Sequence, residues 1–113
     1  MKYMLLIYQN TAAWQALPEA ERQAVMAEAG DIYQELADSG EWVGGEALGD
    51  PSQSRSIRVR SGVPAVTDGP YTEAKEQLAG YGIVECDLDR AVEIATRWPD
   101  ARYWGMEVRP ILG

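Results

Sequence analysis

Histidine and phenylalanine are absent from this 113-residue sequence, and cysteine occurs once, as Cys86. Without histidine, the sequence lacks the commonest general base and the commonest metal ligand. A single cysteine excludes an intramolecular disulfide and offers no metal-binding spacing. Its apolar neighbours Ile83 and Val84 favour a buried, inert thiol. Because a phosphate-binding glycine loop is missing as well, the sequence predicts no metal and no cofactor.

Long apolar runs and an excess of positive charge are also lacking. The longest apolar stretch, residues 4–8, is too short to cross a bilayer, and residues 1–8 do not have the pattern of a signal peptide. A net charge of −8 argues against binding to the phosphates of nucleic acids. We therefore expect a cytoplasmic protein that binds neither membranes nor nucleic acids.

The composition is that of an ordinary globular protein. Hydrophobic residues make up 46% of the chain and charged residues 25%. The length is within the usual range for one domain and provides for a modest core without disulfides. Residues 1–113 are expected to form a single domain.

The hydrophobic pattern predicts strands and two main helices. A helix is expected to begin after Pro18 and to end at Ser39–Gly40, and a second helix to follow Asp87, which is a favourable N-cap. The expected strands cover residues 2–8, 42–47, 55–60, 65–67, 81–86 and 103–109, with a short helical turn at 72–78. This order fits an α+β, ferredoxin-like sheet with both main helices on one face.

A homodimer is predicted from the two faces of the central strands. Two helices cover one face of a sheet, so the other face should be polar unless something else covers it. The first strand is apolar on both faces, with Tyr3, Leu5 and Ile7 on one and Met4, Leu6 and Tyr8 on the other. A second copy packed sheet to sheet would cover the free face. The alternative is that the segments 9–17 and 68–79 fold over it.

The segment from Asp68 to Glu76 is the first candidate for chemistry. A predicted strand ends at Asp68, and a Gly–Pro turn then brings Tyr71, Glu73 and Lys75 close together in sequence. An opposite charge on Lys75 would keep a nearby carboxylate ionised. The structural alternative is that Asp68 caps the turn and the charged residues only solvate a short helix.

A second candidate is the pair Glu107 and Arg109, which share one face of the last strand. A guanidinium group in a cleft would bind a carboxylate or phosphate. The alternative is an exposed charged pair that only fixes the end of the chain. The four tryptophans are either core residues or the lining of a pocket.

Residues 66–81, VTDGPYTEAKEQLAGY, resemble the signature of the DGPF-type proteins in the YCII-related family, with Tyr71 in place of the usual Phe. The first eight residues and the segment 107–111 are also similar to the ends of that family. The resemblance implies a ferredoxin-like fold that forms a dimeric α/β barrel with a cleft at the sheet face. Some relatives are considered enzymes with a His–Asp pair, which this histidine-free sequence cannot form. The resemblance also implies a genomic association with extracytoplasmic-type sigma factors.

Two functions follow as hypotheses. In the first, the dimer binds a small polar or anionic metabolite, with or without cofactor-free catalysis. Asp68 would be the acid or base, while Lys75 and Arg109 would hold negative charge and Tyr71 would orient the ligand. Glu73 and Glu107 complete this candidate site. In the second, the chain is a non-catalytic accessory protein that binds a protein partner such as a sigma factor or its regulator.

Overall fold

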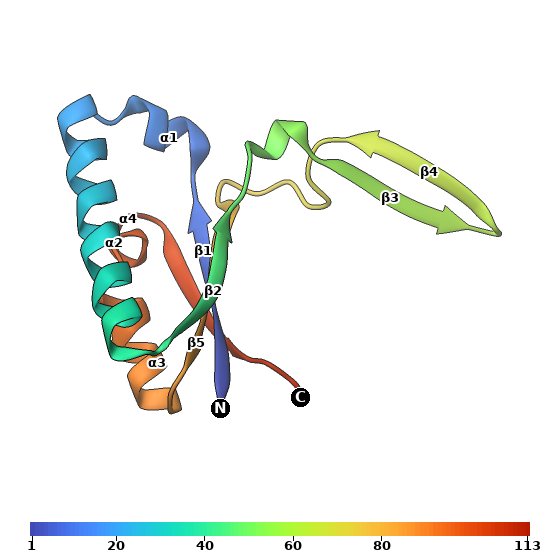
Figure 1. Cartoon of the computed structure of the whole chain (residues 1–113). Coiled ribbons are helices and arrows are strands. Elements are labelled where there is room, and N and C mark those ends of the chain that lie inside the picture. The colour runs from blue at the N-terminus through green and yellow to red at the C-terminus, as the bar shows by residue number, and fades with distance from the viewer.

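A computed structural model describes residues 1–113 and has an α+β architecture (Figure 1). Its strands are β1 (Lys2–Gln9), β2 (Trp42–Ala47), β3 (Arg55–Arg60), β4 (Val63–Asp68), β5 (Gln77–Glu85) and β6 (Gly105–Pro110). Its helices are α1 (Thr11–Ala16), α2 (Glu19–Ser39), α3 (Leu88–Arg97) and α4 (Asp100–Tyr103), with a 3-10 turn at Pro51–Gln53. No helix has the length and apolar character needed to span a membrane.

The main sheet has four strands in the order β2-β5-β1-β6, and all neighbouring strands are antiparallel. Strands β3 and β4 form a separate two-stranded hairpin. Without this hairpin, the chain follows a βαββαβ order, which is the ferredoxin-like arrangement. The predicted α+β, ferredoxin-like fold is confirmed.

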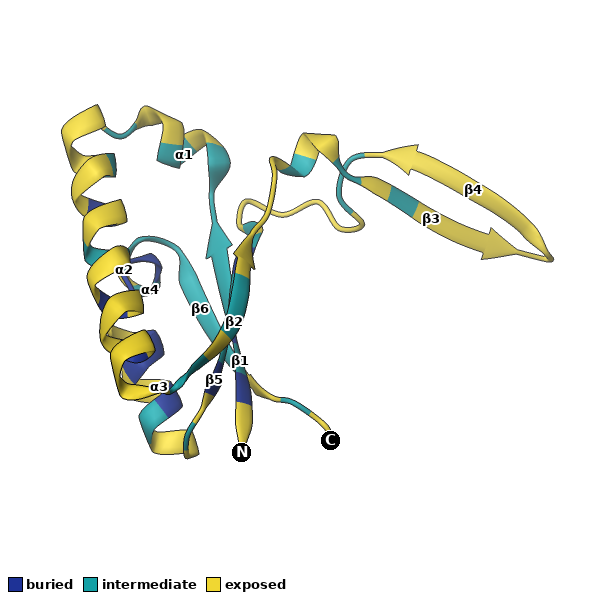
Figure 2. Cartoon of the chain, in the orientation of Figure 1, coloured by how far each residue is buried: buried dark blue, intermediate teal, exposed yellow.

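The helices lie on one side of the main sheet, and the core lies between the two layers (Figures 1 and 2). From the sheet, the core takes Tyr3, Leu5 and Val84, which share one face by the strand register. The helices contribute Ile32, Leu36, Ala91, Ile94, Ala95 and Trp98. Cys86 packs at the margin of this core, and burial raises the pKa of its thiol, as expected for an unreactive cysteine.

Short polar side chains cap the N-termini of two helices, as is typical of Asp and Asn. The Asp87 carboxylate accepts a hydrogen bond of 2.8 Å from the Arg90 backbone N–H, and Asn10 caps α1 in the same way through Ala13 at 3.0 Å. Helix α2 begins after Pro18 and ends at Gly40, whose φ of 80° is in the left-handed region. The predicted bounds of α2 and α3 are therefore confirmed to within one residue.

Three features of the fold differ from the expectation. Residues 70–76 form an irregular loop with bends where a helical turn was expected. The Gln77 side-chain amide donates to the Thr72 and Ala74 carbonyls, which are therefore not bonded in a helical pattern. Helices α1 and α4 occupy segments expected to be loop or strand. Strand β5 begins at Gln77, earlier than the expected start at residue 81.

Helix α2 is held to its neighbours by charged pairs. Arg90 of α3 bonds the Glu41 carboxylate just beyond α2 at 2.8 Å, and Arg97 bonds Glu35 at 2.7 Å. Near the middle of α2, Arg102 of α4 bonds Glu28 at 2.8 Å. These ion pairs join α2, and Glu41 just beyond it, to α3 and α4.

Trp42 requires glycine in the sheet beneath it. A Cβ atom on Gly82 would lie 2.8 Å from the Trp42 ring, and one on Gly45 would lie 2.4 Å from the Tyr81 carbonyl oxygen. The ladder between β2 and β5 shifts register between Trp42 and Gly44, which places a β-bulge beside the glycine pair Gly44–Gly45. The ring thus packs directly on the backbone of β5.

We predict that Gly45→Ala destabilises the protein by about 2 kcal/mol, because its new methyl group collides with backbone that cannot move independently. Gly44→Ala is the matched control, since a Cβ there meets nothing within 4 Å. Urea denaturation of the three proteins measures the difference. Equal stabilities for the two variants would contradict the close packing of β2 on β5.

Candidate functional site

A cleft of about 660 Å³ lies between the helix layer and the sheet. Helix α2 forms one side with Ala29, Gly30 and Tyr33. The strand residues beneath it come from β1, β2 and β5, and α1 and the 3-10 turn border its end. A Cβ on Gly30 would meet nothing within 4 Å, so small residues on α2 leave this space open.

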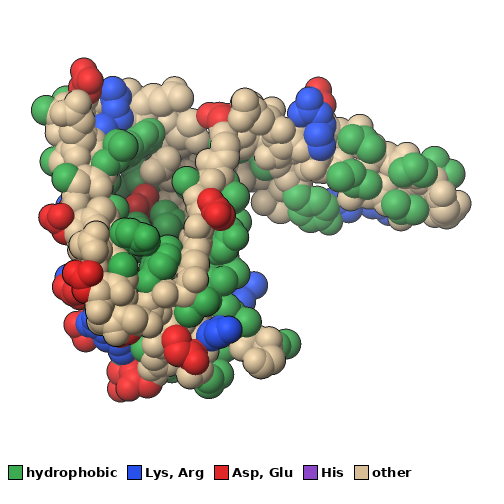
Figure 3. Space-filling model, in the orientation of Figure 1, with side chains coloured by type: hydrophobic (Ala, Val, Ile, Leu, Met, Phe, Trp, Pro, Cys, Tyr) green, Lys and Arg blue, Asp and Glu red, His purple; other side chains and the backbone are tan.

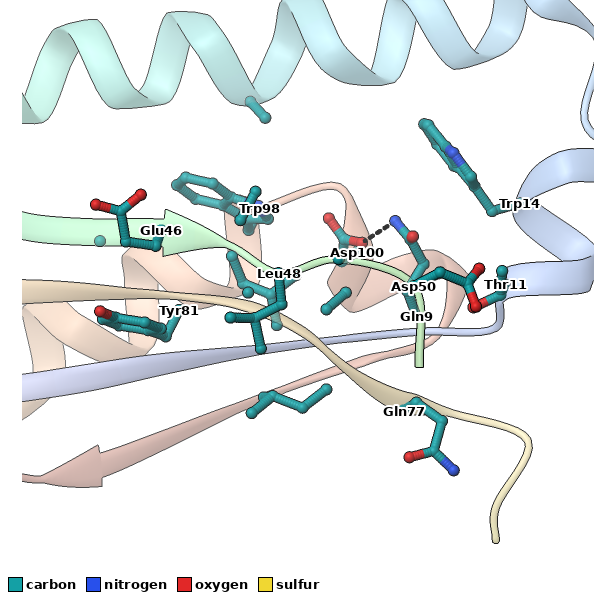
Figure 4. A pocket seen from close by; sticks show the side chains of 18 of the residues that line it. Gln9, Thr11, Trp14, Glu46, Leu48, Asp50, Gln77, Tyr81, Trp98 and Asp100 are labelled. Carbon is teal, nitrogen blue, oxygen red and sulfur yellow. Dashed lines mark hydrogen bonds between the residues drawn. The ribbon is translucent and has the colours of Figure 1, made fainter. Parts of the chain in front are cut away.

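Aromatic rings form much of the wall of the cleft. The rings are those of Trp14, Tyr33, Trp42 and Trp98, while the strand register places the Tyr81 side chain on the opposite face of the sheet. Tyr33 of α2 and Trp42 of β2 meet edge to face, with ring centroids 5.2 Å apart. In Figure 4, the Trp14 and Trp98 rings lie on either side of Asp100 and Gln9. Three of the four tryptophans therefore line this cleft, and Trp98 is also part of the core.

Asp100 is the one charged side chain that the fold buries, with 6% of its surface exposed. It is the first residue of α4 and accepts a hydrogen bond of 3.4 Å from the Gln9 side-chain amide at the end of β1 (Figure 4). Burial raises the pKa of this carboxyl above its usual value of 3.8, and hydrogen bonds oppose the shift only in part. A buried carboxylate without a cationic partner is costly and marks a site of interest.

The charges around the cleft are of one sign. Its lining includes Glu46, Asp50 and Asp100 but no lysine or arginine. The amides of Gln9, Gln15 and Gln77 add polar groups. This arrangement favours a neutral or cationic ligand, because an anion would meet carboxylates without a compensating positive charge.

The first candidate segment lies away from this cleft, at the base of the β3–β4 hairpin. The Asp68 carboxylate is 88% exposed and pairs with Arg55 at 3.2 Å. Tyr71 is exposed beneath the Arg58 guanidinium, 4.7 Å from its ring centroid. Asp68 as a catalytic residue stays a prediction, and its exposure does not provide the burial that a general base needs.

Glu73 and Lys75 lie in the loop that leads into β5, and both are exposed. They line a shallow depression together with Asn10 and Asp50. The structure thus brings these two residues near the end of β1, while Asp68 and Tyr71 stay on the hairpin side.

Glu107 and Arg109 lie on the face of the sheet that the helices do not cover. Their cross-strand partners in β1 are Leu6 and Met4. Arg109 bonds Glu107 at 2.8 Å, and the Tyr8 hydroxyl donates to the same carboxylate at 3.2 Å. The pKa of Glu107 is lowered by the Arg109 hydrogen bond, so the guanidinium is already engaged by a carboxylate of its own strand.

Asp100 and the cleft were not predicted from the sequence. Pro99 follows the end of α3, and Pro followed by Asp is typical of the first turn of a new helix. Gln9 and Asn10 interrupt the apolar pattern after the first strand, and Asn is a favourable N-cap. Both signals point to the short helices α1 and α4, which bring Trp14 and Asp100 to the cleft.

The model of the YCII-related domain matches residues 1–113. The chain belongs to the YCII-related family. It is also similar to an uncharacterized protein of Rhizobium meliloti (strain 1021), with 28% identity over 114 residues that cover 98% of this chain and 92% of that protein. The resemblance to the YCII-related family is confirmed, and this YCII-related protein has a cleft on the helix side of the sheet.

We predict that Asp100→Asn raises the melting temperature at pH 7. Because burial raises the pKa of Asp100, the folded state binds the proton more tightly than the unfolded state, and the charged form weakens folding as the pH rises through the folded-state pKa. The difference between the two proteins should vanish below pH 3.8, where the carboxyl is protonated in both states. Thermal unfolding from pH 3 to pH 8 measures it.

Asp50→Asn is the control for this experiment. The pKa of Asp50 is lowered by hydrogen bonds from Ser52, so its neutral variant should be less stable than the wild type at pH 7. A lower melting temperature for Asp100→Asn at pH 7 would show that the carboxylate stabilises the fold, and would contradict the cost assigned to burying its charge.

Proposed function

We propose that this YCII-related protein is a homodimer that binds a small neutral or cationic organic metabolite in the cleft between α2 and the sheet. The observation that carries the proposal is the buried Asp100 carboxylate among aromatic rings. Concave sites of this volume, with apolar walls and a few convergent polar groups, are typical of small-molecule binding. Aromatic faces and an uncompensated carboxylate are both complementary to positive charge.

Asp100 also has the environment that proton transfer requires. Its carboxyl is buried, its pKa is raised, and it lies at the floor of a cleft large enough for a metabolite. Of the two aspartates considered, Asp100 therefore supports a catalytic version of this function better than Asp68 does. The anionic ligand expected from Lys75 and Arg109 has no counterpart in the lining of this cleft.

The homodimer part of the proposal rests on the sheet face opposite the helices. Its apolar residues come from the inner strands β1 and β5, namely Met4, Leu6, Tyr8, Tyr81 and Ile83. Helix α1, in the first of the two segments that the sequence alternative placed over this face, borders the cleft on the helix side instead. A second copy packed sheet to sheet, as in a dimeric α/β barrel, would bury these side chains.

Matched ligand pairs test the binding proposal. We expect benzylamine, but not benzoate, to raise the melting temperature with dose, because the two differ mainly in charge. At a hundredfold excess over the dissociation constant, binding stabilises the folded state by about 2.7 kcal/mol. Trp14→Ala should abolish the shift, while Lys75→Ala and Arg109→Ala should retain it.

The opposite pattern, a shift with benzoate that either Lys75→Ala or Arg109→Ala abolishes, would support the anionic site and refute the one proposed here. A broader panel of amines, neutral heterocycles and carboxylates extends the test. No shift across that panel would also contradict the proposal, and would favour the second hypothesis of an accessory protein for a sigma factor or its regulator.

The dimer has its own test. We expect sedimentation velocity to find a dimer for the wild type and a monomer for Leu6→Asp, because a charge would be buried at the centre of the interface. Val92→Asp on α3 is the control, since Val92 is already 47% exposed on the opposite layer. A wild-type monomer at all concentrations, or a dimer that survives Leu6→Asp, would contradict sheet-to-sheet packing.

A further inference from the structure

The β3–β4 hairpin, residues 55–68, projects from the main body and is called the arm here (Figure 1). Its two strands pair only with each other. The radius of gyration is 16.0 Å, whereas a compact chain of this length would have about 13 Å. The arm is therefore a long extension with few contacts to its own chain, among them the Tyr71 ring beneath Arg58.

One face of the arm is apolar. The register places Ile57 opposite Val66 and Val59 opposite Pro64, so these four side chains share a face. Ile57, Val59 and Val66 are 57%, 63% and 63% exposed. Figure 3 shows hydrophobic side chains gathered along the arm. A two-stranded hairpin is marginally stable alone in water, and an apolar surface of this kind marks a contact site.

The other face of the arm is basic. Arg58 and Arg60 lie on it together with Val63. The arm contains three arginines and one aspartate and so has a net charge of +2. Because the whole chain has a net charge of −8, the rest of the chain has a net charge of −10. The arm is thus complementary in charge to the body of this same protein.

We propose that the arm packs its apolar face against the second copy in the homodimer. This inference rests on the dimer proposed above and adds a second contact surface to it. Figure 1 shows the arm extending on the side of the sheet away from the helices, which is the side where a second copy would stack. Six residues of strand reach about 20 Å, and packed sheets lie about 10 Å apart, so the arm would pass alongside the partner's sheet.

Two substitutions on one strand test the contact. Val66→Gln changes the apolar face and Val63→Gln the basic face, and the two valines are 63% and 66% exposed. We expect Val66→Gln to raise the dimer dissociation constant about tenfold or more and Val63→Gln to change it less than threefold, by sedimentation. Similar effects of the two variants would overturn the proposal.

Hydrogen exchange of the wild type provides a readout at the arm itself. Backbone amides of residues 55–68 should exchange at least about tenfold more slowly at concentrations where the dimer forms than after dilution to the monomer. A dimer with unchanged exchange in the arm would overturn the arm contact and leave the sheet-to-sheet dimer standing. A protein that is monomeric at every concentration would overturn both.

Discussion

Strand β1 is apolar on both faces, and the rest of the structure is arranged around that constraint. It lies inside the sheet, between β5 and β6, so both its backbone edges are paired. Its Tyr3 and Leu5 side chains anchor the core beneath the helices. On the reverse face, Met4 and Leu6 have neighbours in β5 and β6 but no layer above them. A sheet whose central strand is apolar on both faces needs a second layer over the face that the helices leave open. This is the physical reason for the proposed homodimer.

The cleft is packed less tightly than the core and buries a charged group. Three tryptophans line it, yet only Trp98 is fully part of the core, and Gly30 leaves space that a larger residue of α2 would fill. Asp100 is buried there without a cationic partner and accepts a hydrogen bond of 3.4 Å from the Gln9 amide. Such an arrangement is less stable than a fully packed apolar core. Lower stability of this kind is common where a protein keeps a site for a ligand.

The sequence predicted the fold more completely than the site. Helices α2 and α3 were found because Gly40 and Asp87 are strong end signals and their apolar residues recur at helical spacing. The cleft was missed because it depends on α1 and α4, which are six and four residues long and have little periodicity to detect. Asp68 was a candidate catalytic residue because of the motif in which it lies. A motif in the sequence does not show whether a side chain is buried. Burial of Asp100 results from tertiary packing of segments about 90 residues apart.

The arm enters and leaves the sheet at one place, since Arg55 and Asp68 at its base are cross-strand partners. Its two ends are therefore side by side, and the register of β2 and β5 does not depend on how long the hairpin is. Each cross-strand pair gained or lost at the tip would change the reach by about 3.4 Å while the four main strands stay in place. Insertions or deletions at the tip could therefore change which surface the tip contacts during evolution, while the main sheet keeps its structure.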